Sequence, residues 1–392
     1  MSNQSKNYIL LFIGALILYL VSTGVSYVLF TQFGGKRESV SIDEEVDEIV
    51  DDENFQVDES LPKTEECPLN GKLYTKPERS IWEKRRPLAV MIENSVDARP
   101  QSGVSKADIV YEAVAEGGIT RFMAMFYCGV AEKTEFAPVR SARTYFVDWV
   151  SEYDALYNHV GGAGVCSDPT VDERAKALCQ IDRYGIKDMD QFGISFPSCY
   201  RNPDRLGLPV ATEHQMVCVS NNLFEIAKDR GWTNIDEDGV SWDKSYTSWK
   251  FKDDAEPGDR GAVDQIDLYF WNGYTAFDVT WEYDAVQNVY KRVNGGQPHK
   301  DLETDQQLIA KNVVIQFSEE TSGVDEHKHL LYDTIGSDDA LIFQNGEVIE
   351  GTWSKQSRTA RTRFFDENGK EIQFVRGEIW IEIVPAGNNV TY

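Results

Sequence analysis

The sequence is poor in basic residues and in histidine. Its 39 lysines and arginines face 65 aspartates and glutamates, and the 392 residues carry a formal net charge of −26 with only five histidines. Nucleic-acid binding requires a basic footprint, so this composition argues against DNA or RNA as a partner. It also argues against broad adhesion to anionic lipid. An anionic ligand would therefore need a local basic pocket.

The motifs of well-known catalytic and metal sites are missing. The chain has no G-x-S-x-G elbow, no P-loop and no H-E-x-x-H motif. No C-x-x-C pair occurs among its six cysteines, so nothing indicates a zinc ribbon or a thioredoxin-type site. We predict no cofactor, and Mg²⁺ enters only with the phosphotransferase alternative described below. Whether the protein is an enzyme stays open at this point.

The cysteines are scattered, which is compatible with disulfides outside the cytoplasm and equally with reduced thiols in a core. Between Cys166 and Cys179, the stretch "DPTVDERAKAL" predicts a turn and a short helix that would bring the two together. We predict a disulfide between them. Cys166 follows a glycine-rich stretch, and a nucleophilic role for it is the less favoured alternative.

One long uncharged run is present, from Tyr8 to Phe30. As a helix it would span about 34 Å, enough to cross a bilayer with some tilt. No small-x-small cleavage site follows it and no cysteine lies near it, so we expect a retained single-pass anchor. The positive charges on the two sides of this run are nearly balanced, so they do not indicate which side of the membrane each end occupies. The short tail, residues 1–7, and the cysteines favour a cytoplasmic N-terminus and extracytoplasmic domains.

Residues 31–66 form an acidic linker by composition, because such a segment repels itself and buries little apolar surface. We expect an α/β or α+β domain over residues 67–248. It contains a hairpin at Gly117-Gly118 and helices over residues 142–156, 170–178 and 221–230. Residues 249–392 read as a mostly antiparallel β domain, with Asn-Gly turns at 294–295, 345–346 and 368–369.

The Gly117-Gly118 hairpin predicts a register. With a two-residue turn, Val114 pairs with Arg121, and Glu112 and Glu116 then share a face with Arg121 because side chains alternate along a strand. The predicted Glu–Arg–Glu cluster is either a structural ion pair or the polar floor of a site. In the second case the glutamates orient Arg121 or act as acid and base.

A second basic feature is the segment "APVRSARTYF", residues 137–146. If a helix begins near Ser141, Arg140 and Arg143 lie on one face of it. Together with Arg121 they would form a basic pocket suited to phosphate or carboxylate. The alternative is structural, with the arginines paired to nearby carboxylates: Glu112, Glu116 or Asp148.

Two histidines are candidates for the same site. His159 lies in "YNHVGGAG", where the glycines allow close approach of the backbone to a ligand or a strand. His214 lies in "TEHQMV". Each has a structural alternative as a satisfied core residue. The "HKH" at residues 327–329 lies in an acidic loop, and a solvated loop is preferred there over a metal site.

Several segments resemble the YerB-like lipoproteins. They include "RPLAVMIENSVDARPQSG", "APVRSARTYFVDW", "LYNHVGG", "NVYKRVNGGQPHKD" and "GEIWIEIVP", in the right order between Pro87 and Pro385. The resemblance implies an N-terminal and a C-terminal domain of unknown function in a secreted or membrane-held bacterial protein. This chain departs from it in having a membrane helix and no lipobox cysteine. Where the family has Pro-His-Asn, it has "TEHQMV", which contains His214.

A second set of residues is similar to the LytR–CpsA–Psr phosphotransferases. Asp108 precedes a strand, Arg140 follows an apolar-proline pair, and Asn158 precedes a double glycine. Those enzymes bind polyprenyl pyrophosphate with arginines, so the similarity implies ligand roles for Asp108 and Asn158. Ser141 stands where that family has an aspartate.

We therefore expect a membrane-anchored extracytoplasmic bacterial protein that binds an anionic, for example phosphorylated, cell-envelope component through an arginine-lined pocket. The alternatives are a cell-envelope phosphotransferase acting on a polyprenyl-pyrophosphate-linked substrate, and a scaffold without a small ligand. Convergence of Asp108 with the three arginines would favour the enzyme. The predicted ligand-binding residues are Arg121, Arg140, Arg143, Asp108, Glu112, Glu116, Asn158, His159 and His214.

Overall fold

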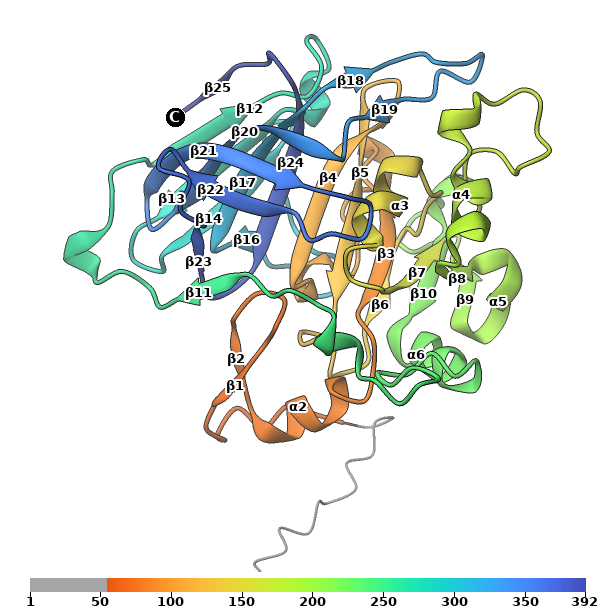
Figure 1. Ribbon diagram of the computed structural model, residues 1–392, viewed down its shortest axis with the longest axis horizontal. Helices are drawn as coiled ribbons and strands as arrows, with labels where there is room; N and C mark the ends of the chain where they lie inside the picture. The colour runs from red at the N-terminus through yellow and green to blue at the C-terminus, as the bar shows by residue number, and fades with distance from the viewer. Residues whose placement is uncertain (1–54) are drawn as a thin grey trace, which may run out of the picture. The chain divides into compact units, whose positions relative to one another are not determined.

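The computed structural model describes residues 55–392 (Figure 1). The predicted anchor over residues 8–30 and most of the predicted linker lie outside the described residues. Along residues 55–392, no helix is long and apolar enough to cross a membrane.

A ten-stranded mixed sheet forms the centre of the described chain (Figure 1). In spatial order its strands are β22 (Arg363–Asp366), β21 (Glu347–Lys355), β20 (Gly336–Gln344), β17 (Asn312–Ser318), β24 (Ile379–Pro385), β4 (Ile109–Glu116), β5 (Ile119–Phe126), β3 (Leu88–Glu93), β7 (Leu156–His159) and β8 (Lys187–Asp190). The pairs β17–β24, β24–β4, β3–β7 and β7–β8 are parallel, and the remaining pairs are antiparallel. β3 and β24 are apolar along almost their whole length, as expected for strands covered on both faces.

The two regions expected to be separate domains share this sheet. β4 comes from the N-terminal region and pairs in parallel with β24, so that Ile109 lies opposite Ile379 and Glu112 opposite Glu382. One hydrophobic cluster runs from Cys67 to Val384. The N-terminal region is mixed α/β and the C-terminal region is β-rich, as predicted, but the expected boundary at residues 248–249 does not separate two cores.

A second sheet, antiparallel throughout, packs on one face of the central sheet. Its strands are β15 (Gln297–Pro298), β14 (Val289–Asn294), β13 (Val279–Asp284), β12 (Gln265–Leu268) and β25 (Val390–Thr391), with β16 (Ile309–Ala310) also paired to β14. The Trp281 ring of β13 contacts the Trp380 ring of β24, with centroids 5.3 Å apart. On the opposite face, Trp149 of α3 (Thr144–Val150) stacks on Tyr111 of β4 at 5.4 Å. The core is therefore layered on both sides of β4 and β24.

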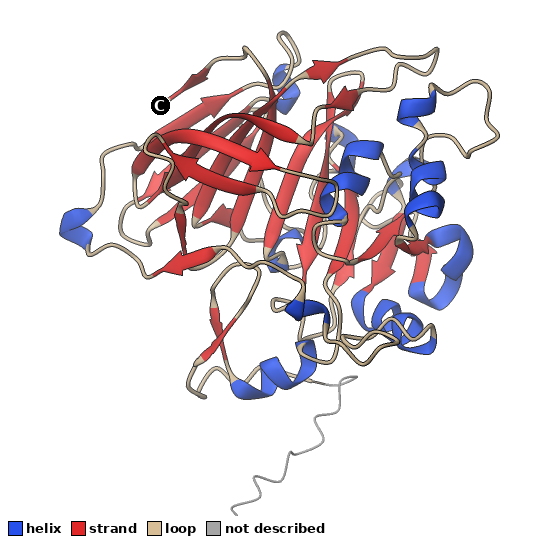
Figure 2. Cartoon of the chain, in the orientation of Figure 1, coloured by secondary structure: helices blue, strands red, loops and turns tan. Residues whose placement is uncertain are grey.

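Most of the helix lies around the β3–β7–β8 end of the central sheet (Figure 2). Within residues 55–392 the other α-helices are α2 (Lys76–Trp82), α4 (Ala177–Tyr184), α5 (Gln191–Ser198) and α6 (Ser220–Asp229). A three-stranded sheet of β6 (Glu135–Phe136), β10 (Met216–Val219) and β9 (Cys199–Arg201) lies in the same region of the chain. Three two-stranded pairs complete the fold: β1 (Glu65–Glu66) with β2 (Leu73–Tyr74), β11 (Lys250–Lys252) with β23 (Gln373–Val375), and β18 (Glu320–Thr321) with β19 (Leu331–Tyr332).

The Gly117-Gly118 hairpin is present, with φ of 58° and 77° at the two glycines. The predicted register beyond it is wrong. Glu116 pairs with Ile119, but Val114 pairs with Thr120 and Ala113 with Arg121. One extra residue in β4, a β-bulge, shifts the strand by one position and moves every side chain below it to the other face. Glu112 therefore does not share a face with Arg121.

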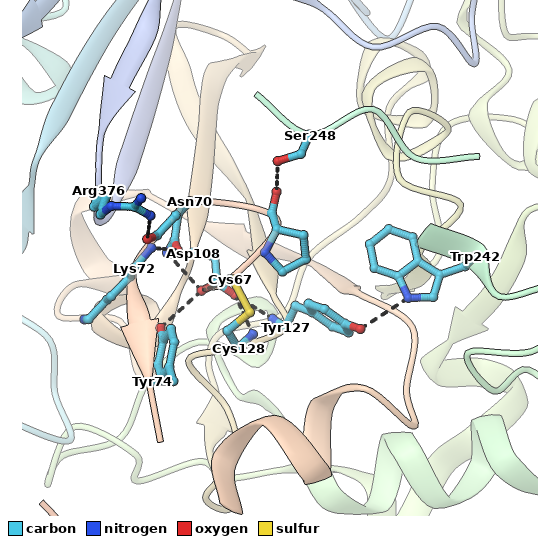
Figure 3. The surroundings of a disulfide bond; sticks show 12 residues. Cys67, Asn70, Lys72, Tyr74, Asp108, Tyr127, Cys128, Trp242, Ser248 and Arg376 are labelled. Atoms are coloured by element: carbon cyan, nitrogen blue, oxygen red, sulfur yellow. Dashed lines mark hydrogen bonds between the residues drawn. A yellow bond between two sulfur atoms is a disulfide. The ribbon is translucent and has the colours of Figure 1, made fainter. Parts of the chain in front are cut away.

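All six cysteines form disulfides: Cys67–Cys128, Cys166–Cys179 and Cys199–Cys218. The second bond joins the pair predicted from the sequence, so Cys166 is not a free thiol. The first lies beside the buried carboxylate of Asp108 (Figure 3). The three disulfides cross-link residues 67–218, the part of the described chain that contains most of the helical residues.

Candidate functional site

The segment "APVRSARTYF" crosses the carboxyl ends of two central strands. The Arg140 N–H donates to Met91 O of β3 at 2.8 Å, and the Val160 N–H, just beyond β7, donates to Arg140 O at 3.1 Å. The Ala142 N–H donates to Gly161 O at 3.0 Å. Because these backbone groups bond to neighbouring strands, they are not available for a helix.

The predicted helix start at Ser141 is therefore wrong. α3 begins at Thr144, and Arg143 precedes it in an extended conformation with φ −136° and ψ 154°. Arg140 and Arg143 are not neighbours on a helix face. Their side chains are positioned by the strand-like path of residues 139–143 instead.

Arg143 and Arg121 share one carboxylate. The Arg143 Nε–H pairs with Glu116 Oε1, and Arg121 Nη2 lies 3.6 Å from Glu116 Oε2. Each arginine also donates to a backbone carbonyl, Arg121 to Ser141 O at 2.7 Å and Arg143 to Ala142 O at 2.6 Å. Both guanidinium groups are almost buried, with side chains 6% and 11% exposed.

A second carboxylate, Glu93, joins Arg140 to the same group. Glu93 ends β3 and pairs across the sheet with Arg121 of β5, so both side chains leave the same face. Arg140 Nε lies 3.4 Å from Glu93 Oε1, and His214 Nδ1 lies 2.8 Å from Glu93 Oε2. We call Arg121, Arg140, Arg143, Glu93, Glu116 and His214 the Arg121 cluster. Sequence reasoning missed Glu93, although an acid at the end of the apolar run "LAVMI" is a visible signal.

The Arg121 cluster has more cations than carboxylates. Burial lowers the pKa of Arg121 to about 10, and repulsion from Arg143 and Arg140 acts in the same direction. Burial on its own would raise the pKa of Glu116, but Arg121 and Arg143 outweigh it and lower that pKa to about 2. The Nε–H groups of Arg121 and Arg140 are buried and make no hydrogen bond. A buried N–H group without a hydrogen bond lowers the stability of the fold, so the cluster is suited to bind a ligand that supplies a hydrogen-bond acceptor.

Asn158 and His159 bond to neighbouring parts of the fold, and none of their hydrogen bonds or ion pairs involves Arg121, Arg140 or Arg143. Asn158 Nδ2 donates to Met189 O of β8 at 2.9 Å. His159 Nδ1 lies 2.8 Å from Gly161 O, and Nε2 lies 3.0 Å from Asp188 Oδ1. Since Gly161 O also accepts from Ala142, His159 supports the arginine segment indirectly.

Asp108 lies beside the Cys67–Cys128 disulfide, among Asn70, Tyr74 and Tyr127 (Figure 3). It is fully buried and accepts hydrogen bonds from Tyr127 N at 2.7 Å, Cys128 N at 2.9 Å and Asn70 Nδ2 at 3.0 Å. Burial raises its pKa to about 6. Tyr127 follows Arg121 by six residues, about 20 Å along an extended chain. Asp108 therefore does not converge with the three arginines, which would have favoured the enzyme alternative, because it stabilises the turn that follows β5.

The sulfur atoms of Cys67 and Cys128 lie near Asp108 in an arrangement of three potential metal ligands. Metal binding by cysteine requires the thiolate. Here the two sulfurs are bonded to each other, so the group is a disulfide packed beside a carboxylate.

Glu112 belongs to a buried cluster between the two sheets, which we call the Arg292 cluster: Glu112, Arg292, His299 and Glu382. Arg292 of β14 donates to Glu112 Oε2 at 2.5 Å, to Glu382 Oε1 at 2.7 Å and to His299 Nδ1 at 3.0 Å. The three charged side chains have no exposed surface. Burial and then repulsion from Glu112 raise the pKa of Glu382 to about 8. Sequence reasoning missed Arg292 and Glu382, which come from strands far from Glu112 in the chain.

Five cavities of 360 to 510 Å³ in the described chain are lined by other residues than Arg121, Arg140 and Arg143. The arginines thus form a charged cluster at the end of β3 and β5, with Arg140 as its most exposed member at 31%. None of these five cavities is the arginine-lined pocket that was predicted.

Comparison with known proteins agrees with the resemblance seen in the sequence. The model described as "Protein of unknown function (DUF3048) N-terminal domain" matches residues 71–206, and the model for its C-terminal domain matches residues 266–381. "Putative lipoprotein YerB" of Bacillus subtilis (strain 168) is 31% identical over 322 residues, which covers 81% of this chain and 86% of that protein. The crystal structure of YerB from Bacillus subtilis matches with a TM-score of 0.66 at 27% identity, covering 84% of this chain and 100% of that one. This chain therefore belongs to the DUF3048 family, to which the YerB-like segments pointed.

Proposed function

We propose that the protein is a binding protein of the bacterial envelope, anchored in the membrane, and that its Arg121 cluster holds a compact anion. The observation that carries the proposal is the pair of buried Nε–H groups on Arg121 and Arg140 that make no hydrogen bond, the second lying 3.4 Å from Glu93 Oε1 as an ion pair only. They lie in a cluster of three guanidinium groups and two carboxylates. An anion would neutralise the surplus charge and accept the unmade hydrogen bonds, each contributing roughly 1.5–3 kcal/mol.

The proposed location rests on three features. All six cysteines are in disulfides, which persist in oxidising compartments. The Bacillus subtilis relative is named a lipoprotein. The uncharged run over residues 8–30 is long enough for an anchor. In this setting the compact anion is a phosphorylated or otherwise anionic envelope component.

The geometry favours binding over phosphotransfer. The phosphotransferase alternative needs a carboxylate beside the arginines in the role of Asp108, and Asp108 is hydrogen-bonded at the far end of β5. Glu93 and Glu116 are already paired with arginines or His214.

The proposal is tested by calorimetric titration of the full-length chain with inorganic phosphate and pyrophosphate. Arg140→Gln removes the most exposed guanidinium of the cluster, and we expect at least about a tenfold loss of affinity, equivalent to 1.4 kcal/mol. Arg174→Gln is the matched control. It makes the same change in net charge at a side chain 63% exposed, whose partner is Asp172.

Equal weakening by Arg140→Gln and Arg174→Gln would show a general charge effect and overturn the site. Absence of saturable binding by the wild-type chain would also overturn it and would favour the scaffold alternative, in which the arginines serve only as ion pairs.

A further inference from the structure

Two of the segments that carry the family resemblance meet in space. Asn94 and Gln101 in "ENSVDARPQSG" contact the segment "NGGQPHKD" of the C-terminal region. Asn94 Nδ2 donates to Asn294 Oδ1 at 3.0 Å, and the ring nitrogen His299 Nε2 lies 2.7 Å from Gln101 Oε1. Gln101 also forms a bridge with Asp301. The contact joins the two regions that match the N-terminal and C-terminal family models.

A cavity of about 370 Å³ lies at this contact, and we call it the Arg99 cavity. Its walls come from both regions: Val96, Arg99 and Pro100 on one side, and Ala276, Asn294, Gly295, Gln297, Pro298, His299 and Lys300 on the other. Cavities of this size at the junction of two regions, with apolar walls and few polar groups, are typical of small-molecule sites.

Arg99 is a cation without a carboxylate partner among the described residues. Its Nε–H and one Nη2–H donate to Asn94 O, at 3.2 Å and 2.9 Å, and one Nη1–H donates to Ala276 O at 2.9 Å. No ion pair of the described chain includes Arg99, and the Phe277 ring lies 5.2 Å from the guanidinium. One N–H on each terminal nitrogen is left over from these bonds. Burial lowers the pKa of Arg99 to about 10, since the charge is poorly solvated.

The other polar groups of the cavity do not supply the missing negative charge. The Nδ1 of His299 accepts from Arg292, so its Nε2–H donates to Gln101 and the ring is neutral. Burial lowers the pKa of His299, and the neighbouring arginines act in the same direction. Lys300 is a second cation at the edge, paired with Asp305 at 2.9 Å.

We propose that the Arg99 cavity binds a small carboxylate with an apolar body. The carboxylate accepts the two remaining N–H groups of Arg99, and the body lies against Pro100, Ala276 and Pro298. A single guanidinium matches one negative charge, whereas a phosphate dianion would leave excess charge in a largely apolar site. The Arg99 cavity shares no residue with the Arg121 cluster, so this inference is independent of the proposed function.

The test compares benzoate with benzamide, a neutral analogue of the same shape, by calorimetric titration of the full-length chain. We expect saturable binding of benzoate and at least about tenfold weaker binding of benzamide. Val96→Glu introduces a carboxylate next to Arg99, because Val96 and Arg99 are three residues apart across the short helical turn Val96–Ala98. It should weaken benzoate binding at least tenfold, and Val96→Gln, equal in size but uncharged, should leave it within about threefold.

Val96 is 53% exposed, so neither change disturbs the core. If Val96→Glu does not fold, the exposed Gln297 on the opposite wall provides the same comparison, because Gln297→Glu adds a carboxylate and the wild-type residue is already the uncharged amide. Three outcomes would each overturn the proposal. Benzoate and benzamide could bind equally well, the Glu and Gln side chains at one position could give equal affinities for benzoate, or benzoate could fail to bind saturably. Arg140→Gln should not alter benzoate binding, and a loss there would place the carboxylate in the Arg121 cluster instead.

Discussion

The Arg121 cluster and the Arg292 cluster are made from the same residue types but differ in balance and exposure. Arg292 lies between two glutamates with no exposed surface, and all three of its guanidinium nitrogens are hydrogen-bonded. The Arg121 cluster has three arginines for two carboxylates, two unbonded Nε–H groups and an exposed edge. A buried charge is tolerated when it is paired and bonded. The first arrangement is therefore suited to joining two sheets, and the second to accepting an anion.

The largest expected effect is the loss of Arg292. Arg292→Met leaves Glu112 and Glu382 buried without their cation, and breaking such a buried pair costs about 3–5 kcal/mol. Urea unfolding measures this change in the free energy of unfolding. Arg363→Met is the control, since the Arg363 side chain is 43% exposed against Glu371 and such a pair contributes about 1 kcal/mol or less. Similar losses for both variants would remove the distinction drawn here for Arg292.

The second effect concerns Glu116 and depends on pH. Its pKa is lowered from 4.5 to about 2 in the folded chain, so its contribution to stability is present above pH 4.5 and is lost as the pH falls towards 2. We expect Glu116→Gln to cost about 2–3 kcal/mol at pH 7. The difference from wild type, measured by urea unfolding at several pH values, should shrink to near zero close to pH 2. A difference that is constant with pH would show that Glu116 is not held by Arg121 and Arg143.

A smaller effect is expected for Glu382→Gln. The pKa of Glu382 is raised from 4.5 to about 8, so the stability due to its protonated form is complete below pH 4.5 and is lost as the pH rises through 8. Glutamine resembles the protonated acid, and we expect a cost of no more than about 1 kcal/mol at pH 4, where Glu382 is protonated in the folded chain. As the pH rises from 4.5 to 8, wild type loses this stability and the variant does not, so the variant should gain stability relative to wild type. A loss as large as that of Arg292→Met would contradict a protonated Glu382.

The smallest effect on stability is expected at Arg140. Its partner Glu93 keeps the 2.8 Å contact with His214, and its side chain is 31% exposed, so Arg140→Gln should change the free energy of unfolding by less than about 1 kcal/mol. Thermal unfolding with and without phosphate separates stability from binding. Phosphate should stabilise wild type more than the variant, and a large loss of stability without phosphate would make Arg140 a structural residue.

Much of the architecture was predictable from local pattern. The apolar run at residues 88–94 is β3, the glycine pair at 117–118 is a hairpin turn, and Asn345-Gly346 joins β20 to β21 with φ of 54° and 70°. Between β14 and β15 the turn moves one residue, to Gly295-Gly296, because both of those positions adopt positive φ. The helix expected over residues 142–156 is the shorter α3. It starts late because backbone groups up to Ala142 bond to other strands, and it ends early because Leu156 already belongs to β7.

The candidate site was only partly predictable. Arg121, Arg140, Arg143, Glu116 and His214 come together, as part of the predicted set. Glu112 does not join them, because one bulged residue in β4 reverses the face that it occupies. Asp108 does not join them either, because it lies nine residues before the Gly117-Gly118 turn and Arg121 only three after it, so the hairpin places them toward opposite ends.

The sequence by itself determined what short-range chemistry determines: the acidic surface, the strands and turns, the pairing of Cys166 with Cys179, and the family. Only the tertiary structure decided which charges meet. Glu112, Arg292 and Glu382 come from strands separated by more than 80 residues and become neighbours because β4 pairs in parallel with β24 and β14 packs across them. Burial then lowers the dielectric around them, so the same arginine and glutamate residues join two sheets in one place and leave a surplus of positive charge in another.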